Sequence, residues 1–272
     1  MNGTIIRIIS NLYTVEAEGK MYQCRARGKF YHDKLTPLVG DKVIIDPDNN
    51  YIMKLHKRKN SLPRPNIANV DMALIITSTK QPNLDLNLLD KLITIVIYNK
   101  IKPVICFTKI DLLNTKEKKE LNKLIKYYNK IGINTLTNQN IKKLTKIMNN
   151  NIVVLTGQSG AGKSALLNKL DKSLNLETKP ISKALGRGVH TTRHVELFKH
   201  KGALIADTPG FSALDLDYLS PEELKNTFLE FKLNCEYKDC MHKDEINCEV
   251  KRLVNEGKIL KSRYQNYLKF GR

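Results

Sequence analysis

The sequence predicts three domains of different fold class: a β-barrel at residues 1–64, an α/β domain at residues 65–214 and a helical domain at residues 215–272. Three patterns support this division. Short alternating segments separated by turns fill the first part, strands alternate with helices in the second, and helices flank a cysteine cluster in the third. A chain of 272 residues is long enough for two or three domains with separate cores.

The first domain has the pattern of a small closed barrel. Segments such as "GTIIRIIS", "LYTVEAEG" and "GDKVIIDPD" alternate apolar and polar residues, and turn signals stand at Gly19, Gly28, Gly40 and residues 48–50. Five such strands favour an OB-fold. The following segment, "KRKNSLPRPNIAN", carries two prolines among basic residues and is interpreted as a linker.

The second domain has the pattern of a doubly wound α/β fold. "DMALIITS", "PVICFT" and "NIVVLTG" are nearly continuous apolar runs, as expected for parallel strands buried on both faces, and helical segments separate them. In the third domain, Ser220 is expected to cap a helix and Glu223 to close its capping box. Gly257 is a candidate break in the basic C-terminal helix.

The composition favours a polyanionic partner. The formal net charge is +19 and the pI is about 9.6, which favours nucleic acid through release of counterions from phosphates. One alternative is compositional drift toward Lys, Asn and Ile, as an AT-rich genome produces. A lesser one is an anionic membrane surface, because no strongly amphipathic basic segment stands out. No run reaches the ~18 apolar residues of a membrane helix, and "MNGTIIRIIS" lacks the features of a signal peptide. We therefore expect a cytoplasmic, monomeric protein without a membrane partner.

A phosphate-binding loop is encoded by "GQSGAGKS", which fits G-x-x-x-x-G-K-[ST] without exception. Its glycines let backbone N–H groups wrap the phosphates, Lys163 reaches the β- and γ-phosphates, and Ser164 offers a hydroxyl to Mg²⁺. An apolar strand precedes the loop and a helix follows it, as such a loop requires. The predicted phosphate-binding residues are Gly157, Gln158, Ser159, Gly160, Ala161, Gly162, Lys163, Ser164 and Ala165.

A base-reading motif, "TKID", follows the strand "PVICFT". The Asp111 carboxylate can accept hydrogen bonds from guanine N1 and N2, for which adenine has no matching donors, and Lys109 can lie along the base plane. We therefore expect Thr108, Lys109, Ile110 and Asp111 to bind the base of GTP.

Two further segments carry the pattern of nucleotide switches. "DTPG" follows the strand "ALIA", so Asp207 is expected to hold Mg²⁺ through water and the Gly210 N–H to meet the γ-phosphate. The preceding "GRGVHTTRH" contains Thr191 and Thr192, either of which can supply the switch-one hydroxyl to Mg²⁺ and the γ-phosphate. Thr191 is preferred, and Thr192 remains open.

The residue after D-x-x-G predicts slow intrinsic hydrolysis. It is Phe211, which cannot orient the attacking water as the Gln of Ras-like enzymes does. His190 is a candidate for that role, with a plain surface imidazole as an equally weighted alternative.

The motifs stand in an unusual order: base reader, phosphate loop, switch one, D-x-x-G. Moving the last segments of an ordinary GTPase to its front gives this order, so the domain is interpreted as circularly permuted. The sheet can stay unchanged because natural termini often lie close together. Past Phe211 the chain enters the third domain, and we hypothesise that γ-phosphate contacts bias the position of that domain.

A metal site is indicated by "CEYKDCMHKDEINC". Cys235, Cys240, His242 and Cys248 supply three thiolates and one imidazole, which form a closed tetrahedral shell for one structural zinc ion. The alternative is a set of scattered reduced thiols.

Together these residues resemble one family, the circularly permuted small-subunit assembly GTPases called RsgA. The resemblance rests on "LPRPNIANVD", on T/N-K-x-D before "GQSGAGKS", on "GRGVHTT", "DTPGF" and the cysteine cluster, and it spans essentially the whole chain. It departs from the family pattern in Thr108, which stands for Asn and can weaken GTP affinity, and in the loop of Thr137 and Asn138, a poor match to a second base-contacting loop.

The resemblance implies an OB-fold, a permuted GTPase domain and a zinc domain, and a role in late maturation of the small ribosomal subunit. The predicted activity is Mg²⁺-assisted hydrolysis of GTP to GDP, stimulated by that subunit, with its ribosomal RNA as partner. The rivals are a P-loop ATPase or small-molecule kinase, and a zinc-bearing RNA-binding module whose nucleotide is only a structural ligand. The candidate RNA contacts, for each of which a solvated basic face is an equal alternative, are Arg25, Arg27, Lys29, Arg58 and Arg64.

Overall fold

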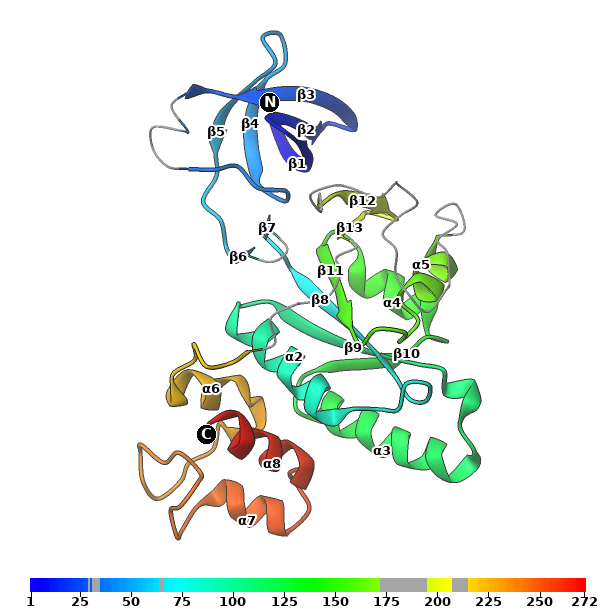
Figure 1. The fold of residues 1–272 in the computed structure, drawn as a ribbon, viewed down its shortest axis with the longest axis vertical. Coiled ribbons are helices and arrows are strands. Elements are labelled where there is room, and N and C mark those ends of the chain that lie inside the picture. Colours follow the sequence, from blue (N-terminus) through cyan, green and yellow to red (C-terminus); the bar gives the residue numbers. More distant parts are fainter. Residues whose placement is uncertain (29, 31–34, 64–65, 172–194, 207–214) are drawn as a thin grey trace. The chain divides into compact units, whose positions relative to one another are not determined.

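The computed structural model describes residues 1–28, 30, 35–63, 66–171, 195–206 and 215–272 (Figure 1). These residues form two compact units. The first unit comprises Met1–Leu74, Asn140–Thr156 and Lys163–Ser212, and the second comprises Ile75–Gln139, Gly157–Gly162 and Ala213–Arg272. No helix among the described residues is long and apolar enough to cross a membrane.

The N-terminal strands close into the expected five-stranded barrel, with neighbours in the order β1-β2-β3-β5-β4. Its core is filled by alternate residues of each strand, including Ile5, Val15, Cys24 and Val43, all fully buried. The period of two that predicted these strands therefore also determines which side chains face inward. The strands are β1 (Asn2–Ile9), β2 (Leu12–Ala17), β3 (Lys20–Ala26), β4 (Lys42–Asp46) and β5 (Tyr51–Leu55).

The segment after the barrel contains a small hairpin rather than a structureless linker. β6 (Ser61–Pro63) pairs antiparallel with β7 (Asn66–Ala68). Gly40 packs so closely against β7 that a Cβ atom there would lie 2.1 Å from the Ala68 carbonyl oxygen. The contacts that order this segment are long-range, so the local proline and lysine pattern did not reveal the hairpin.

Arg58 belongs to the same junction. Its guanidinium donates Nε–H to Oδ1 and Nη2–H to Oδ2 of the fully buried Asp41, at 2.7 Å each, and a further bond to the Thr36 carbonyl oxygen. The bidentate pair with buried Asp41 gives Arg58 a structural role next to the barrel.

A six-stranded sheet follows in the order β10-β9-β8-β11-β13-β12. β9–β10 and β11–β13 pair in parallel, and β12 pairs antiparallel with β13. Strand β11, which carries the phosphate loop, stands where the chain order reverses, the usual ligand position in open α/β sheets. The strands are β8 (Met72–Ser78), β9 (Lys102–Thr108), β10 (Asn134–Thr137), β11 (Ile152–Gly157), β12 (Leu197–His200) and β13 (Ala203–Ala206).

The helices of this α/β region begin at recognisable caps. The Asp85 carboxylate caps α2 (Leu86–Tyr98) by accepting from the N–H groups of Asn87 and Leu88. Asn114 and Glu117 form a capping box at the start of α3 (Thr115–Lys130). The remaining elements are the 3₁₀ turn η1 (Ile110–Leu112), α4 (Ile141–Met148) and α5 (Lys163–Leu170).

The C-terminal module is helical, as predicted. Ser220 and Glu223 form the expected capping box, and the C-terminal helix is interrupted at Gly257, which has a φ of +69°. Phe228, Phe231 and Tyr267 form an aromatic core with ring centroids 5.0–5.3 Å apart. The elements are α6 (Pro221–Thr227), η3 (Leu229–Phe231), α7 (Glu249–Asn255) and α8 (Lys261–Phe270).

A buried ionic network joins the C-terminal module to α2 and α3 within the second unit, where α8 runs beside α2 (Figure 1). The Arg263 side chain, 1% exposed, donates to Asp90 at 2.7 Å and to both oxygens of Glu230 at 2.7 and 2.9 Å. Tyr128 donates to Asp90, and Tyr127 donates to Glu230. Each carboxylate therefore has several donors, and neutral hydrogen-bond donors stabilise the second negative charge that the single guanidinium does not balance.

Candidate functional site

The phosphate loop begins where β11 ends. Gly157 has a φ of +136°, and a Cβ atom at this position would lie 1.9 Å from the Ile76 carbonyl oxygen of β8. Gly160 and Gly162 also have positive φ values, of +73° and +89°. At Gly157 only glycine combines this conformation with such close backbone approach, whereas at Gly160 and Gly162 the positive φ alone favours glycine. Helix α5 begins at Lys163, directly after the loop.

The first residue of the base-reading motif contacts the phosphate loop. The Thr108 hydroxyl, on the buried end of β9, donates to the Ala161 carbonyl oxygen at 2.6 Å. Gly162 also lies beside Thr108, since a Cβ atom added to Gly162 would be 3.9 Å from Thr108 Oγ1. The two motifs, 46 residues apart at their nearest ends in the sequence (Asp111 and Gly157), are therefore neighbours within the second unit. Thr108, which stands where asparagine is usual, makes a hydrogen bond that holds the loop against the base-reading strand.

Lys109 and Asp111 follow on the η1 turn. Lys109 has a φ of +56°, and its ammonium donates to the Gln81 carbonyl oxygen in the loop after β8. The Asp111 side chain is exposed and accepts no hydrogen bond from any described residue. Its carboxylate is therefore available to two donors of a ligand, as guanine recognition requires.

The loop after β8 supports the base-reading motif, a role that no sequence motif indicated. The Thr79 hydroxyl donates to the Thr108 carbonyl oxygen at 2.9 Å, and Lys80 binds Glu117 at 2.8 Å. The hydrogen bond from Lys80 holds the pKa of the Glu117 carboxyl below its usual value. The parallel sheet gives a reason for this role. The carboxyl ends of adjacent parallel strands meet at one edge, so the loops that follow such strands are neighbours.

The loop after β10 offers one polar atom without a partner. The Asn138 side-chain oxygen is buried and accepts no hydrogen bond from the described residues, although the Asn138 backbone N–H donates to the Phe107 carbonyl oxygen. A buried acceptor left unpaired costs about 1–3 kcal/mol, so a ligand N–H at this place would be favoured. The observation is compatible with a second base-contacting loop at this position, although the sequence of Thr137 and Asn138 matches such a loop poorly.

The described residues include the whole base motif and the whole phosphate loop, and they bring the two motifs together. The predicted switch residues cannot be placed in the same way. His190, Thr191, Thr192, Asp207 and Gly210 lie outside the described residues, as do Lys29 and Arg64.

The cysteine cluster is assembled as a candidate metal centre. The ligand atoms of Cys235, Cys240, His242 and Cys248 all lie within 4.8 Å of one another. The three sulfurs are 3.3–3.6 Å from His242 Nδ1. A tetrahedral zinc ion with Zn–S of about 2.3 Å and Zn–N of about 2.0–2.1 Å would separate S and N by about 3.6 Å. The spacing therefore fits such an ion.

The protonation of these groups points the same way. Burial raises the pKa of the Cys240 thiol to about 12 and lowers the pKa of His242. A divalent cation at this place would stabilise thiolates and bind the neutral imidazole.

Comparisons with known proteins agree with this geometry. The RsgA N-terminal domain model matches residues 2–52, and the RsgA GTPase model matches residues 55–217. The small ribosomal subunit biogenesis GTPase RsgA of Enterococcus faecalis is 43% identical over 99% of this chain and 94% of its own length. The protein of the same name from Lactobacillus gasseri is 44% identical over 98% of this chain and 93% of its own length.

Solved structures share the fold over nearly the whole chain. YloQ, described as a circularly permuted GTPase, superposes with a TM-score of 0.85 at 35% identity, covering 99% of this chain and 93% of its own. YjeQ from Thermotoga maritima gives a TM-score of 0.86 at 32% identity, covering 99% and 96%. The resemblance inferred from the motifs is thus confirmed, and the chain is a GTP hydrolase that belongs to the RsgA GTPase family.

Proposed function

We propose that this GTPase acts in late maturation of the small ribosomal subunit and that the subunit stimulates its hydrolysis of GTP. The contact of Thr108 with Ala161 carries the nucleotide part of the proposal, because it places the predicted guanine-reading motif beside the phosphate loop. The relatives named for small-subunit biogenesis, at 43–44% identity over nearly the whole chain, support the biological setting.

The proposed roles follow from the motifs. Thr108, Lys109, Ile110 and Asp111 bind the guanine, and residues 157–165 bind the phosphates. Lys163 would neutralise charge that develops on the phosphoryl oxygens during attack by water.

The predicted residues would hold a magnesium ion, which would supply stabilisation of the charge on the phosphates. Ser164 would hold it directly, Asp207 through water, and Thr191 or Thr192 from switch one, while the Gly210 N–H would meet the γ-phosphate. We retain His190 as the candidate for orienting the attacking water. Because Phe211 cannot do so, turnover without a partner is expected to be slow.

The cysteine cluster fits one structural zinc ion per chain, held by Cys235, Cys240, His242 and Cys248. With no open coordination position, the ion would stabilise the C-terminal module and take no part in hydrolysis. We propose domain boundaries near residues 64 and 214, a monomeric protein, and a cytoplasmic location beside its ribosomal partner.

The test is GTP turnover with and without purified small ribosomal subunits, measured as phosphate release. We expect at least about a tenfold increase in kcat with the subunit, since a partner that completes a GTPase site can supply factors of 10³ or more. Large ribosomal subunits at equal RNA concentration are the control. Equal turnover with both subunits, or no stimulation by either, would contradict the ribosomal role and leave the GTPase assignment intact.

A further inference from the structure

A lysine-rich groove of about 690 Å³ lies within the first unit, and none of its lining residues belongs to the phosphate loop or the base-reading motif. Its lining residues come from the barrel, from the segments just after β5 and β7, and from the start of β11, from β12 and from β13. Four lysines and two carboxylates line it, giving a net charge of +2. These are Lys42, Lys57, Lys59, Lys199, Glu16 and Asp71.

Two of the lysines carry charges that no carboxylate neutralises. Lys42 donates to the Thr4 hydroxyl at 2.8 Å, and Lys57 has no ion-pair partner among the described residues. The other two are paired in water-accessible positions. Lys199, 56% exposed, binds Glu16 at 3.0 Å, and Lys59, 46% exposed, binds Asp71. Pairs this exposed are worth little and can change partners.

The lining indicates what kind of ligand the groove can bind. Ammonium groups attract phosphates as point charges, and the other polar lining groups are Thr and Asn side chains. No aromatic ring or arginine lines the groove among the described residues, so nothing there stacks on a base or reads one with a fork of donors. Small-molecule pockets, in contrast, are mostly apolar and enclosing.

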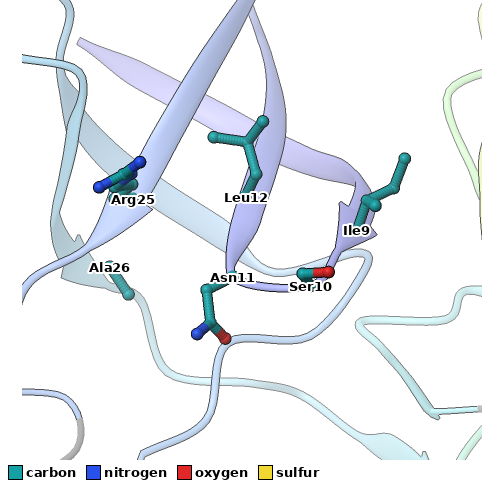
Figure 2. A pocket seen from close by; sticks show the side chains of 6 residues that line it. All are labelled: Ile9, Ser10, Asn11, Leu12, Arg25 and Ala26. Atoms are coloured by element: carbon teal, nitrogen blue, oxygen red, sulfur yellow. The ribbon is translucent and has the colours of Figure 1, made fainter.

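The hollow at the β1–β2 turn shows the contrast within the same barrel. Figure 2 shows Arg25 as the single charged side chain there, with Ser10 and Asn11 at the turn and Leu12 beside them. The groove carries four cations where this hollow carries one. Phosphate recognition without base reading therefore fits the groove better than the hollow.

We propose that this groove binds the phosphodiester backbone of ribosomal RNA, an inference that rests on the proposed function. Backbone contacts of this kind position a protein on RNA without reading sequence, and they suit a chain whose net charge is +19. Lys199 lies on β12, which begins five residues after Thr192, so RNA in the groove contacts the strand that continues from the predicted switch-one segment.

The first test removes the two charges that no carboxylate neutralises. The variant K42Q/K57Q is compared with K119Q/K126Q, which makes the same charge change at exposed positions of α3. Affinity for purified small subunits and for a poly(U) 20-mer is measured from 50 to 300 mM salt. We expect about a 10- to 100-fold loss for the groove variant and a shallower salt dependence, with a slope lower by about 1–2, because each lost phosphate contact lowers the slope by about 0.7–0.9. The control variant should lose less than about threefold.

The second test should strengthen RNA binding instead of weakening it. E16Q removes the carboxylate that binds Lys199 and should tighten binding of poly(U) by about threefold, since one more ammonium becomes free for phosphate. GTP turnover without subunits and the melting temperature should be unchanged in all these variants, which shows that the site and fold are intact.

The outcomes separate the two proposals. Equal losses in the groove and control variants, or no loss in either, would overturn the groove as the RNA site even when subunits stimulate wild-type turnover. Displacement of poly(U) by polyglutamate at equal charge concentration would also overturn it and indicate an acidic protein partner. If subunits neither bind nor stimulate the wild type, the proposed function fails, and the poly(U) comparison still decides the groove.

Discussion

The two charged clusters of this chain differ most in their contact with water. The Arg263 side chain is 1% exposed and its partners Asp90 and Glu230 are 0% and 4% exposed, whereas Lys59 and Lys199 of the groove are 46% and 56% exposed. In the buried cluster every carboxylate is matched by several donors. In the groove, four lysines face two carboxylates and the surplus charge is open to solvent.

This difference in solvent exposure separates charges that stabilise the fold from charges that remain available to a partner. Removing one member of a buried pair strands the other in a medium that solvates it poorly, so such a cluster keeps its geometry. An exposed lysine loses little when its partner leaves, because water and salt replace the interaction. The Arg263 cluster therefore fixes the C-terminal module on α2 and α3, and the groove can exchange its ions for phosphates.

The largest expected effect is at the buried cluster. Arg263→Ala should lower the free energy of unfolding by about 3–5 kcal/mol, because Asp90 and Glu230 would be left buried without their cation. The measurement is denaturant unfolding at pH 7. The matched control is Arg252→Ala on α7, whose side chain is 55% exposed beside Glu249 and Glu256. It should cost much less, because water and salt screen this exposed pair. Similar costs for both arginines would contradict the distinction between the clusters.

A smaller effect is expected where the buried contact is a single neutral hydrogen bond. Thr108→Val removes the hydroxyl that binds the Ala161 carbonyl oxygen and should weaken GTP binding by about 5- to 100-fold, corresponding to about 1–3 kcal/mol for an acceptor left unpaired. Equilibrium binding of a fluorescent GTP analogue measures it. Thr135→Val, another buried threonine whose hydroxyl binds the nearby Ile133 carbonyl oxygen, is the control and should bind GTP like the wild type. Unchanged GTP affinity of Thr108→Val would show that this hydrogen bond does not contribute to GTP binding.

The smallest expected effect is in the acid response of the buried cluster. Burial alone would raise the pKa of the Glu230 carboxyl, but the charge and hydrogen bonds of Arg263 outweigh it and hold the pKa below 4.5. A carboxyl whose pKa is lowered on folding contributes stability above the unfolded pKa and loses it as pH falls through the folded value.

Unfolding free energies of the wild type and Glu230→Gln should therefore differ most near pH 7 and converge as the pH falls below 4.5. A difference that stays constant between pH 7 and pH 3 would show that Glu230 does not titrate with the folding transition.

Local sequence signals predicted the parts of this molecule that depend on near neighbours. The glycines of the phosphate loop, the Ser220–Glu223 capping box and the break at Gly257 each follow from backbone rules over a few residues. The cysteine cluster was predictable because its ligand types and spacing are specific to a metal site.

Contacts between distant segments were not predictable in this way. The basic segment containing Arg263 resembles any solvated helix, and only the fold brings it to Asp90, 173 residues earlier in the chain. The bond of Thr108 to Ala161 likewise depends on the order of strands in the sheet. The four groove lysines come from three segments. Only Lys57 and Lys59 stand in a local basic run, so no local charge pattern linked them to Lys42 or Lys199.

The most direct test of the account is the base specificity of Asp111→Asn. A carboxylate accepts from guanine N1–H and the exocyclic amine, whereas an amide accepts from N1–H and donates to the 2-carbonyl oxygen of xanthine. The account predicts at least about a 100-fold loss of GTP affinity and a gain in XTP affinity, measured by competition against one labelled nucleotide, because a site built for one hydrogen-bond pattern rejects the mismatched ligand strongly. An Asp111→Asn variant that binds GTP as tightly as the wild type and still rejects XTP would contradict it.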